Sequence, residues 1–222
     1  MGYEVRQYTP LRSLTAARER LLDGVDVVLD VGANAGQYGT MLRELGFAGR
    51  LVSLEPVAEA FAELERRATA DPAWEAVCVA ASDADGEVTL NVTGDSRSSS
   101  VLARNERFAD KAGWAPKECR QVAARRLDGL VEELLRPGER AFLKLDIQGY
   151  ERHVLDGAGA VLARFAALEL ELSVTPLYEG QPGLTEMLPL LAQRGFRPVC
   201  LEPILLDDEG LLMELDGLFA RA

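Results

Sequence analysis

The stretch Val27-Val28-Leu29-Asp30-Val31-Gly32-Ala33-Asn34-Ala35-Gly36 decides the fold of this chain. Its first five residues are dominated by Val and Leu, which is typical of a strand buried on both faces. A Gly-x-Asn-x-Gly turn follows, and a helix is expected to start near Gln37. Gly32 and Gly36 can adopt positive φ and let the backbone approach a bound molecule, while the first helical amides point outward as donors. The stretch predicts a ligand-binding turn, although a Gly-rich connection without a ligand has the same pattern.

Length and charge limit the kinds of protein that this chain can be. Its 222 residues fit one α/β domain spanning 1–222, with a helical segment inside 1–24 that packs on or caps the domain. A net charge of -12 would repel a phosphate backbone, so we expect no nucleic-acid partner. No apolar run reaches the ~18 residues that cross a bilayer, and the N-terminus lacks a signal-peptide core. We therefore expect a cytoplasmic protein without a membrane partner.

The three cysteines point to neither a disulfide framework nor a metal site. Cys78, Cys119 and Cys200 lie far apart and lack the paired spacing of zinc or redox motifs. We expect them to be reduced packing residues.

Hydrophobic periodicity predicts an alternation of strands and helices along the chain. Strands are expected at 27–31, 50–55, 77–81, 87–92, 119–125, 141–146 and 166–172, with a closing hairpin of 197–206 and 211–215. Helices are expected at 10–22, from 37 to a cap at Gly46, over 57–68, at 129–135 capped by Asp128, from Gly149 to about Leu162, and at 184–194. Because the strand at 77–81 is followed by another strand, we expect a short β insertion there.

An acidic residue ends the second predicted strand. Glu55 lies 19 residues past Gly36 and is followed by Pro56, which suits the first turn of a helix. In nucleotide-binding βαβ units, an acid roughly 20 residues beyond the glycine turn reaches the ribose hydroxyls. A solvated acid at a strand end is the alternative, but the combination with the turn favours a ligand role for Glu55.

The second strong signal is the apolar strand 141–146, which ends in Asp146 and runs into the turn Ile147-Gln148-Gly149. Open α/β sheets bind ligands at the carboxyl ends of their strands. We therefore expect Asp146 to face the same crevice as the glycine turn, provided that its strand lies beside the first.

Four stretches carry a family resemblance: Asp30-Val-Gly-Ala-Asn-Ala-Gly36, Ala81-Ser-Asp-Ala-Asp-Gly86, Leu143-Lys-Leu-Asp-Ile-Gln-Gly-Tyr-Glu151, and Glu171-Leu-Ser173 with Leu177-Tyr-Glu-Gly180. Together they resemble the FkbM family of S-adenosylmethionine-dependent methyltransferases. The resemblance implies a class I methyltransferase (Rossmann-like) α/β fold, in which a mostly parallel seven-stranded sheet ends in an antiparallel C-terminal hairpin. A nicotinamide dehydrogenase would instead carry Gly-x-Gly-x-x-Gly and a second βαβ half.

The resemblance also implies a cofactor, S-adenosylmethionine, and a set of residues around it. The methionine and sulfonium part would be lined by Asp30, Gly32, Asn34 and Gly36, the ribose by Glu55, and the adenine edge by Ser82 or Asp83. Ala33, Pro56 and Asp146 complete the expected cofactor set. Many relatives have Glu where this chain has Gln148, so a role that needs a second carboxylate there does not transfer.

Methyl transfer to a hydroxyl also requires removal of a proton, by a base or with the help of a metal. His153 is the single histidine of the chain and a candidate base, although a satisfied or solvent-facing side chain is the favoured interpretation. Asp146 is the preferred catalytic candidate, as base or as substrate ligand. Tyr150, Glu151 and Tyr178 are further acceptor-side candidates, with packing the favoured role of each tyrosine.

Asp146 and Glu171 could together hold a divalent cation such as magnesium, manganese or calcium. The competing interpretation places Glu171 against a helix, paired with an Arg. We favour a site without a metal.

The expected function is O-methylation of a hydroxyl on a small metabolite, a sugar or a natural product, which are common acceptors of the family that the chain resembles. N-methylation of an amine or peptide is the alternative, and a binding module that has lost catalysis is a third. A homodimer is compatible with the sequence. We expect the acceptor to be selected by 94–118, 146–153 and 173–183.

Overall fold

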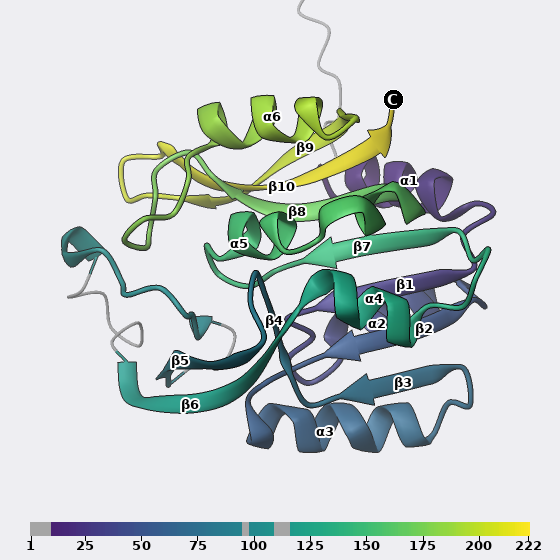
Figure 1. The fold of residues 1–222 in the computed structure, drawn as a ribbon. Coiled ribbons are helices and arrows are strands. Elements are labelled where there is room, and N and C mark those ends of the chain that lie inside the picture. The colour runs from purple at the N-terminus through teal and green to yellow at the C-terminus, as the bar shows by residue number, and fades with distance from the viewer. Residues whose placement is uncertain (1–9, 95–97, 109–115) are drawn as a thin grey trace, which may run out of the picture.

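A seven-stranded sheet forms the centre of the molecule, with the strand order β3-β2-β1-β7-β8-β10-β9 (Figure 1). The computed structural model describes residues 10–94, 98–108 and 116–222. The strands are β1 (Val27–Val31), β2 (Arg50–Leu54), β3 (Trp74–Val77), β7 (Ala141–Leu145), β8 (Phe165–Ser173), β9 (Phe196–Leu206) and β10 (Leu212–Arg221). Neighbouring strands from β3 to β8 are parallel, and β10 runs antiparallel to both β8 and β9. The predicted mostly parallel sheet with an antiparallel C-terminal hairpin is confirmed.

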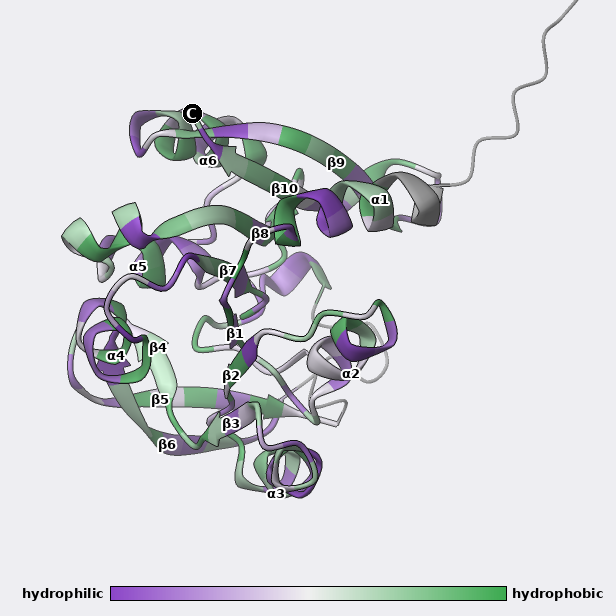
Figure 2. Ribbon diagram, turned by 90° about the vertical axis from the view of Figure 1, so that its right-hand side faces the viewer, coloured by the Kyte–Doolittle hydropathy of each residue, from purple (hydrophilic) through white to green (hydrophobic). Residues whose placement is uncertain are grey.

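Helices cover both faces of this sheet, because its central strands are apolar on both sides. The helices are α1 (Pro10–Leu22), α2 (Gln37–Glu44), α3 (Ala58–Thr69), α4 (Leu127–Leu134), α5 (Glu151–Asp156) and α6 (Leu184–Gln193), with the 3-10 turns η2 (Glu106–Phe108) and η3 (Gly159–Arg164). Val28 packs into the cluster that contains Leu42 of α2, whereas its neighbour Leu29 packs with Leu130 of α4. Figure 2 shows α1 and α2 on one side of the sheet and α4 and α5 on the other.

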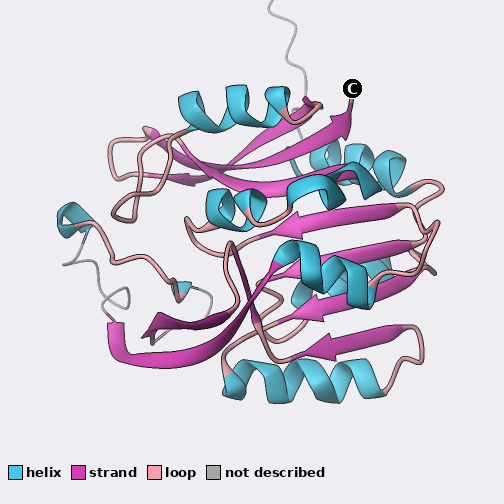
Figure 3. Cartoon of the chain, viewed as in Figure 1, coloured by secondary structure: helices cyan, strands magenta, loops and turns pink. Residues whose placement is uncertain are grey.

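A second, three-stranded sheet is inserted between β3 and α4. It has the order β4-β6-β5 and consists of β4 (Ala80–Ser82), β5 (Gly86–Thr93) and β6 (Pro116–Arg126) (Figure 3). The predicted β insertion is therefore present, but the single strand predicted at 77–81 is wrong. The chain turns at Val79, whose amide bonds to the Val77 carbonyl at 3.1 Å, so β3 ends in the large sheet and β4 starts in the small one. The apolar run gives no sign of this break.

Four predicted boundaries differ from the structure for local reasons. The helix expected from Gly149 to Leu162 is split into α5 and η3, and a Cβ on the intervening Gly157 would lie 2.2 Å from the Ser82 carbonyl oxygen. Asp128 does not cap α4, because the cap position is Arg126 and Asp128 lies inside the first turn. Pro56 precedes α3, which starts at Ala58. The last strand continues past Leu215 to Arg221.

The first helix is fixed to the sheet by a buried ion pair. Arg18 of α1 donates from Nε and Nη2 to the two carboxylate oxygens of Glu169 on β8, at 2.8 and 2.5 Å. The Tyr38 hydroxyl donates to the same carboxylate at 2.7 Å. Arg18 and Glu169 are both buried, so each charge depends on the other for compensation. None of the described helices is long and apolar enough to cross a membrane.

The Arg18→Ala variant should lower the free energy of unfolding by about 3–5 kcal/mol, because it leaves the Glu169 carboxylate buried without its partner. The double variant Arg18→Ala/Glu169→Gln should lose less, since a neutral amide replaces the isolated charge. Urea unfolding of both proteins measures the difference. An equal loss in the two variants would contradict this role for the pair.

Candidate active site

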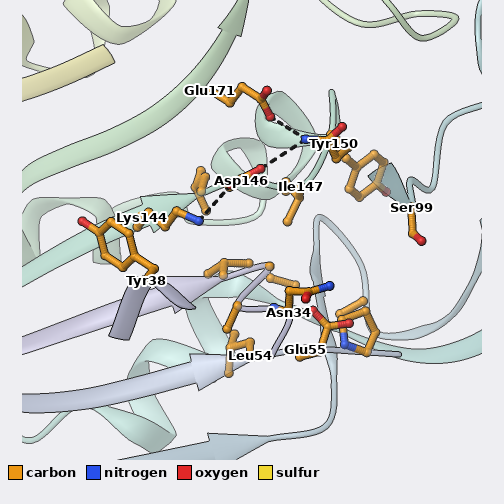
Figure 4. A pocket seen from close by; sticks show the side chains of 18 of the residues that line it. Asn34, Tyr38, Leu54, Glu55, Ser99, Lys144, Asp146, Ile147, Tyr150 and Glu171 are labelled. Carbon is orange, nitrogen blue, oxygen red and sulfur yellow. Dashed lines mark hydrogen bonds and ion pairs between the residues drawn. The ribbon is translucent and has the colours of Figure 1, made fainter. Parts of the chain in front are cut away.

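A cavity of about 480 Å³ lies at the carboxyl ends of the central parallel strands (Figure 4). One wall is the turn after β1 together with Glu55 at the end of β2, and the opposite wall is the 146–148 segment after β7. The two walls face each other because β1 pairs with both β2 and β7. The sheet order therefore brings together the two motifs that the sequence singled out, as expected.

The turn after β1 is held very close to the loop after β7. The amides of Gly32 and Ala33 both donate to the Leu54 carbonyl at 3.0 Å, and Gly32 has a φ of 81°. A Cβ on Gly32 would lie 2.0 Å from the backbone oxygen of Asp146. Asn34 also adopts a left-handed conformation, with a φ of 48°. This turn accordingly requires a glycine at position 32, for both the space and the backbone angle.

Glu55 joins the turn to the start of α3. Its Oε2 accepts the amide of Asn34 and its Oε1 accepts the amide of Val57, each at 2.8 Å. The side chain is only 5% exposed, and burial raises the pKa of Glu55 to about 7. Each carboxylate oxygen has a further lone pair, so the group can still accept hydrogen bonds from a ligand in the cavity.

The opposite wall contains two linked carboxyl groups, Asp146 and Glu171. The Lys144 ammonium lies 3.1 Å from Asp146 Oδ2, and Gln148 Nε2 donates to Asp146 Oδ1 at 3.2 Å and to Glu171 Oε2 at 2.6 Å. Burial favours a higher pKa for Asp146, but the charge of Lys144 and hydrogen bonds from its neighbours hold that pKa below its ordinary value. Burial and then the charge of Asp146 raise the pKa of Glu171 well above its ordinary value. In this pair the ionised form is therefore favoured at Asp146 and the protonated form at Glu171.

Asp216 on β10 is a third acid of the cavity wall, and the sequence did not predict it. It is the register partner of Glu171, and among the described residues its carboxylate makes no hydrogen bond or ion pair. Burial, followed by the charge of Glu169, raises the pKa of Asp216 to about 7. The predicted strand stopped at Leu215 because Gly217 interrupts the apolar alternation, which resumes at Phe219.

Lys144 and Tyr38 were also missed as cavity residues. The Lys144 ammonium lies 5.0 Å from the centre of the Tyr38 ring, and both line the cavity. A lysine inside an otherwise apolar strand is the sequence signal that could have indicated a paired charge at this position.

Six of the residues predicted to bind the cofactor line the cavity: Gly32, Ala33, Asn34, Glu55, Pro56 and Asp146. Four do not: Asp30, Gly36, Ser82 and Asp83. Asp30 is fully buried below the cavity floor, 3.7 Å from the Lys144 ammonium. Ser82 forms a hydrogen bond with the Tyr150 hydroxyl at 3.2 Å, so Tyr150 separates it from the cavity.

His153, the second predicted catalytic residue, does not line the cavity. Its ring stacks on Tyr150 with 4.2 Å between the ring centres. Of the further acceptor-side candidates, Tyr150 lines the cavity, whereas Tyr178 and Glu151 are buried outside it. Glu151 accepts the amides of Ile147 and Gly149, at 3.1 and 3.2 Å, which is a structural role in the turn.

The segments predicted to select the acceptor are only partly described. Residues 95–97 and 109–115 lie outside the described residues, while Ser99 and Val101 of the same region line the cavity. In the described part of the chain, no group of three or more His, Cys, Asp or Glu residues could hold a metal ion. The alternative in which Glu171 pairs with an Arg does not hold among the described residues, where its partners are Gln148, Asp146 and Glu214.

Comparison with known proteins identifies the family of the chain and agrees with its fold. The model of the methyltransferase FkbM domain matches residues 30–198. No curated protein matches the chain.

Among solved structures, an rRNA methylase from Streptococcus thermophilus has 12% identity and a TM-score of 0.52, with 98% of this chain and 99% of that chain covered. A putative methyltransferase from Streptococcus mutans, solved in complex with SAH, has 9% identity and a TM-score of 0.53, with 98% of this chain and 100% of that chain covered. A putative tRNA (m1A22) methyltransferase from Streptococcus pneumoniae, in complex with S-adenosyl-L-methionine, has 14% identity and a TM-score of 0.51, with 92% and 71% covered. At these identities the likeness concerns the fold, and it confirms the predicted class I methyltransferase architecture.

The Gly32→Ala variant should be destabilised by roughly 1–3 kcal/mol more than Gly46→Ala, because only the Cβ at position 32 would meet backbone atoms. The two glycines have similar φ values, 81° and 86°, so Gly46→Ala reports the cost of the left-handed backbone alone. Guanidinium unfolding measures both variants. Equal losses would show that the turn has room for a side chain.

Proposed function

The chain belongs to the FkbM family of S-adenosylmethionine-dependent methyltransferases, and on that premise we propose that it methylates a hydroxyl of a small metabolite, sugar or natural product. The observation that carries the proposal is the buried Glu55 carboxylate, which faces the cavity beside the turn after β1. Glu55 makes no ion pair with any residue that the structure describes, and such a carboxylate at the end of β2 suits the two adjacent hydroxyls of a ribose.

The residues that would hold the cofactor extend from Glu55 along the turn after β1. Glu55 would accept hydrogen bonds from the ribose hydroxyls, and Gly32 and Asn34 would lie beside the methionine part. Val57, Val79, Ala81 and Leu90, which form the apolar part of the wall beside Glu55, would hold the adenine. This placement replaces the polar contact with Ser82 or Asp83 that the sequence resemblance implied.

The acceptor occupies the other end of the cavity, between Tyr38, Glu171, Asp216 and Ile204. Methyl transfer is an in-line displacement, so the acceptor oxygen has to lie behind the methyl carbon, opposite the sulfur. Holding the two reactants in that geometry can supply roughly 7–11 kcal/mol of the barrier reduction.

Asp216 is better suited than Asp146 or His153 to take the proton of the acceptor. Both oxygens of Asp146 are engaged, and its pKa is lowered. His153 is outside the cavity wall. Asp216 faces the cavity with a pKa of about 7, close to the value at which a base works best near neutral pH.

The transfer then balances without a further reactant. When bound, S-adenosylmethionine would supply the methyl group, and the electron pair of its broken carbon–sulfur bond would stay on sulfur in S-adenosylhomocysteine as the acceptor oxygen forms the new bond to carbon. The hydroxyl proton moves to the Asp216 carboxylate.

N-methylation is the second candidate. The acids at the acceptor end are compatible with it, because Asp216 could bind an amine as well as a hydroxyl. A small-molecule acceptor is preferred to RNA, since a net charge of -12 opposes the approach of a phosphate backbone.

S-adenosylhomocysteine should bind the protein and raise its melting temperature, whereas NAD should not. Glu55→Gln should weaken the binding of S-adenosylhomocysteine by roughly 10- to 150-fold, through the loss of charge-assisted hydrogen bonds. Calorimetric titration measures both dissociation constants. The absence of a response to S-adenosylhomocysteine in the unaltered protein would refute the proposed cofactor.

The pH dependence gives a second test of Glu55. Its raised pKa means that the carboxyl is protonated below about pH 7 and ionised above it. Because ribose hydroxyls donate to the ionised form, the affinity for S-adenosylhomocysteine should increase from about pH 6 to about pH 8. Glu55→Gln should flatten this increase, and an unchanged pH profile in that variant would exclude Glu55 as its source.

Asp216→Asn should slow methyl transfer by roughly 10²- to 10⁴-fold while leaving the affinity for S-adenosylhomocysteine unchanged. The rate of the unaltered enzyme should increase with pH through about 7, and the variant should lose that increase. The assay follows S-adenosylhomocysteine release with an acceptor found by mass spectrometry in a panel of hydroxyl and amine compounds. Asp208→Asn, on the exposed tip of the β9–β10 hairpin, is the control and should behave like the unaltered enzyme.

A further inference from the structure

Two carboxyl groups from neighbouring parallel strands converge on a single atom in the cavity wall. Asp146 follows β7 and Glu171 belongs to β8, and Figure 4 shows both side chains turned toward the same point. That point is Nε2 of Gln148, which lies 3.2 Å from Asp146 Oδ1 and 2.6 Å from Glu171 Oε2. Two converging carboxylate oxygens are the arrangement that a divalent cation uses, but here an NH₂ group occupies the position.

The orientation of the Gln148 side-chain amide is set by two hydrogen-bond donors, Arg104 and Tyr178. Arg104 Nη2 donates to the Tyr178 hydroxyl at 2.9 Å, and that hydroxyl donates to Gln148 Oε1 at 2.7 Å. The Asp146 carboxylate lies 3.1 Å from the Lys144 ammonium and accepts hydrogen bonds. A reversed amide would place an oxygen against that carboxylate, and the Tyr178 hydroxyl would keep only the Ser98 carbonyl, at 3.3 Å, as an acceptor. The chain of donors therefore directs Nε2, and not Oε1, between the two acids.

The backbone holds Gln148 in this place. Its φ is 56°, a left-handed conformation that a non-glycine residue keeps only when its surroundings impose it. The Ser100 hydroxyl donates to the Gln148 carbonyl at 2.7 Å and fixes the peptide from the other side. The backbone is therefore fixed, and a side chain that rotated away from the acids would lose the bonds of Nε2 and also the bond from Tyr178 to Oε1.

We propose that the Gln148 amide takes the place of a divalent cation between Asp146 and Glu171, so that this residue keeps the site free of metal. The amide joins the two acids through neutral N–H donors, which repel a cation, whereas a third oxygen at that position would help to bind one. Changing Gln148 to Glu supplies this oxygen in a side chain of the same length. The inference goes beyond the proposed function, because it concerns which ion the site admits and not which acceptor it methylates.

Manganese binding to the unaltered protein and to Gln148→Glu tests the proposal directly. Mn²⁺ should bind the unaltered protein at most weakly and leave its melting temperature unchanged, and EDTA should have no effect on it. Gln148→Glu should melt at a lower temperature in EDTA, because three carboxyl groups then face one another. Mn²⁺ should restore its melting temperature and bind roughly tenfold or more tightly than to the unaltered protein, with one ion per chain.

Two further variants test whether the response to Mn²⁺ comes from a specific three-carboxylate site or from added negative charge in general. Gln37→Glu adds the same charge to another part of the cavity wall and should not respond to Mn²⁺. Gln148→Glu/Glu171→Gln removes one of the three ligands and should lose most of the response. If both respond as strongly as Gln148→Glu, the three-carboxylate site is refuted.

Tight binding of Mn²⁺ to the unaltered protein would overturn the proposal, since the amide would then turn its oxygen toward the ion. A Gln148→Glu variant that is as stable as the unaltered protein in EDTA and insensitive to Mn²⁺ would also overturn it. If the variant does not fold in EDTA, refolding with Mn²⁺ decides: recovery supports the proposal and failure refutes it. None of these readouts involves S-adenosylmethionine or an acceptor, so their failure is distinguishable from failure of the proposed function.

Discussion

The buried carboxylate of Glu55 holds together the segments that form the cavity. It accepts the amide of Asn34 in the turn after β1 and the amide of Val57 before α3, so the turn and the helix are fixed by one side chain. The turn can then lie against the loop after β7, because Gly32 has no Cβ to meet the Asp146 carbonyl. Burial disfavours the ionised carboxylate and raises the pKa of Glu55 to about 7. A ligand that donates hydrogen bonds to Glu55 offsets this cost. The buried carboxylate that holds the turn in place therefore also favours a ligand with hydrogen-bond donors.

The acidic side chains at the two ends of the cavity have different partners. At one end Glu55 has backbone amides as partners and an apolar wall beside it, which suits a nucleoside. At the other end the charge of Asp146 is balanced by Lys144, and burial and the charge of Asp146 raise the pKa of Glu171. Asp216, in register with Glu171, is the acid that has no such partner among the described residues. This difference is the reason why the proposed function assigns the cofactor to the first end and proton transfer to the second.

The sequence predicted the features that depend on local pattern. The apolar strand before Gly32, the acid at position 55 and the strand that ends in Asp146 were all recognisable, because strand ends in a parallel sheet gather at one edge. It could not predict features that depend on contacts distant along the chain. The break at Val79 lies inside a continuous apolar run, His153 is turned away by stacking on Tyr150, and Asp216 is hidden by the interruption at Gly217. The position of the Gln148 amide depends on Tyr178 and Arg104, which no local pattern connects to it.

A crystal structure of the protein with S-adenosylhomocysteine tests the central claim most directly. We predict both ribose hydroxyls within hydrogen-bonding distance of Glu55, the methionine part over the turn from Gly32 to Asn34, and the sulfur facing the end of the cavity that contains Asp216. A nucleoside bound without contact to Glu55, or density for the ligand outside this cavity, would contradict the account.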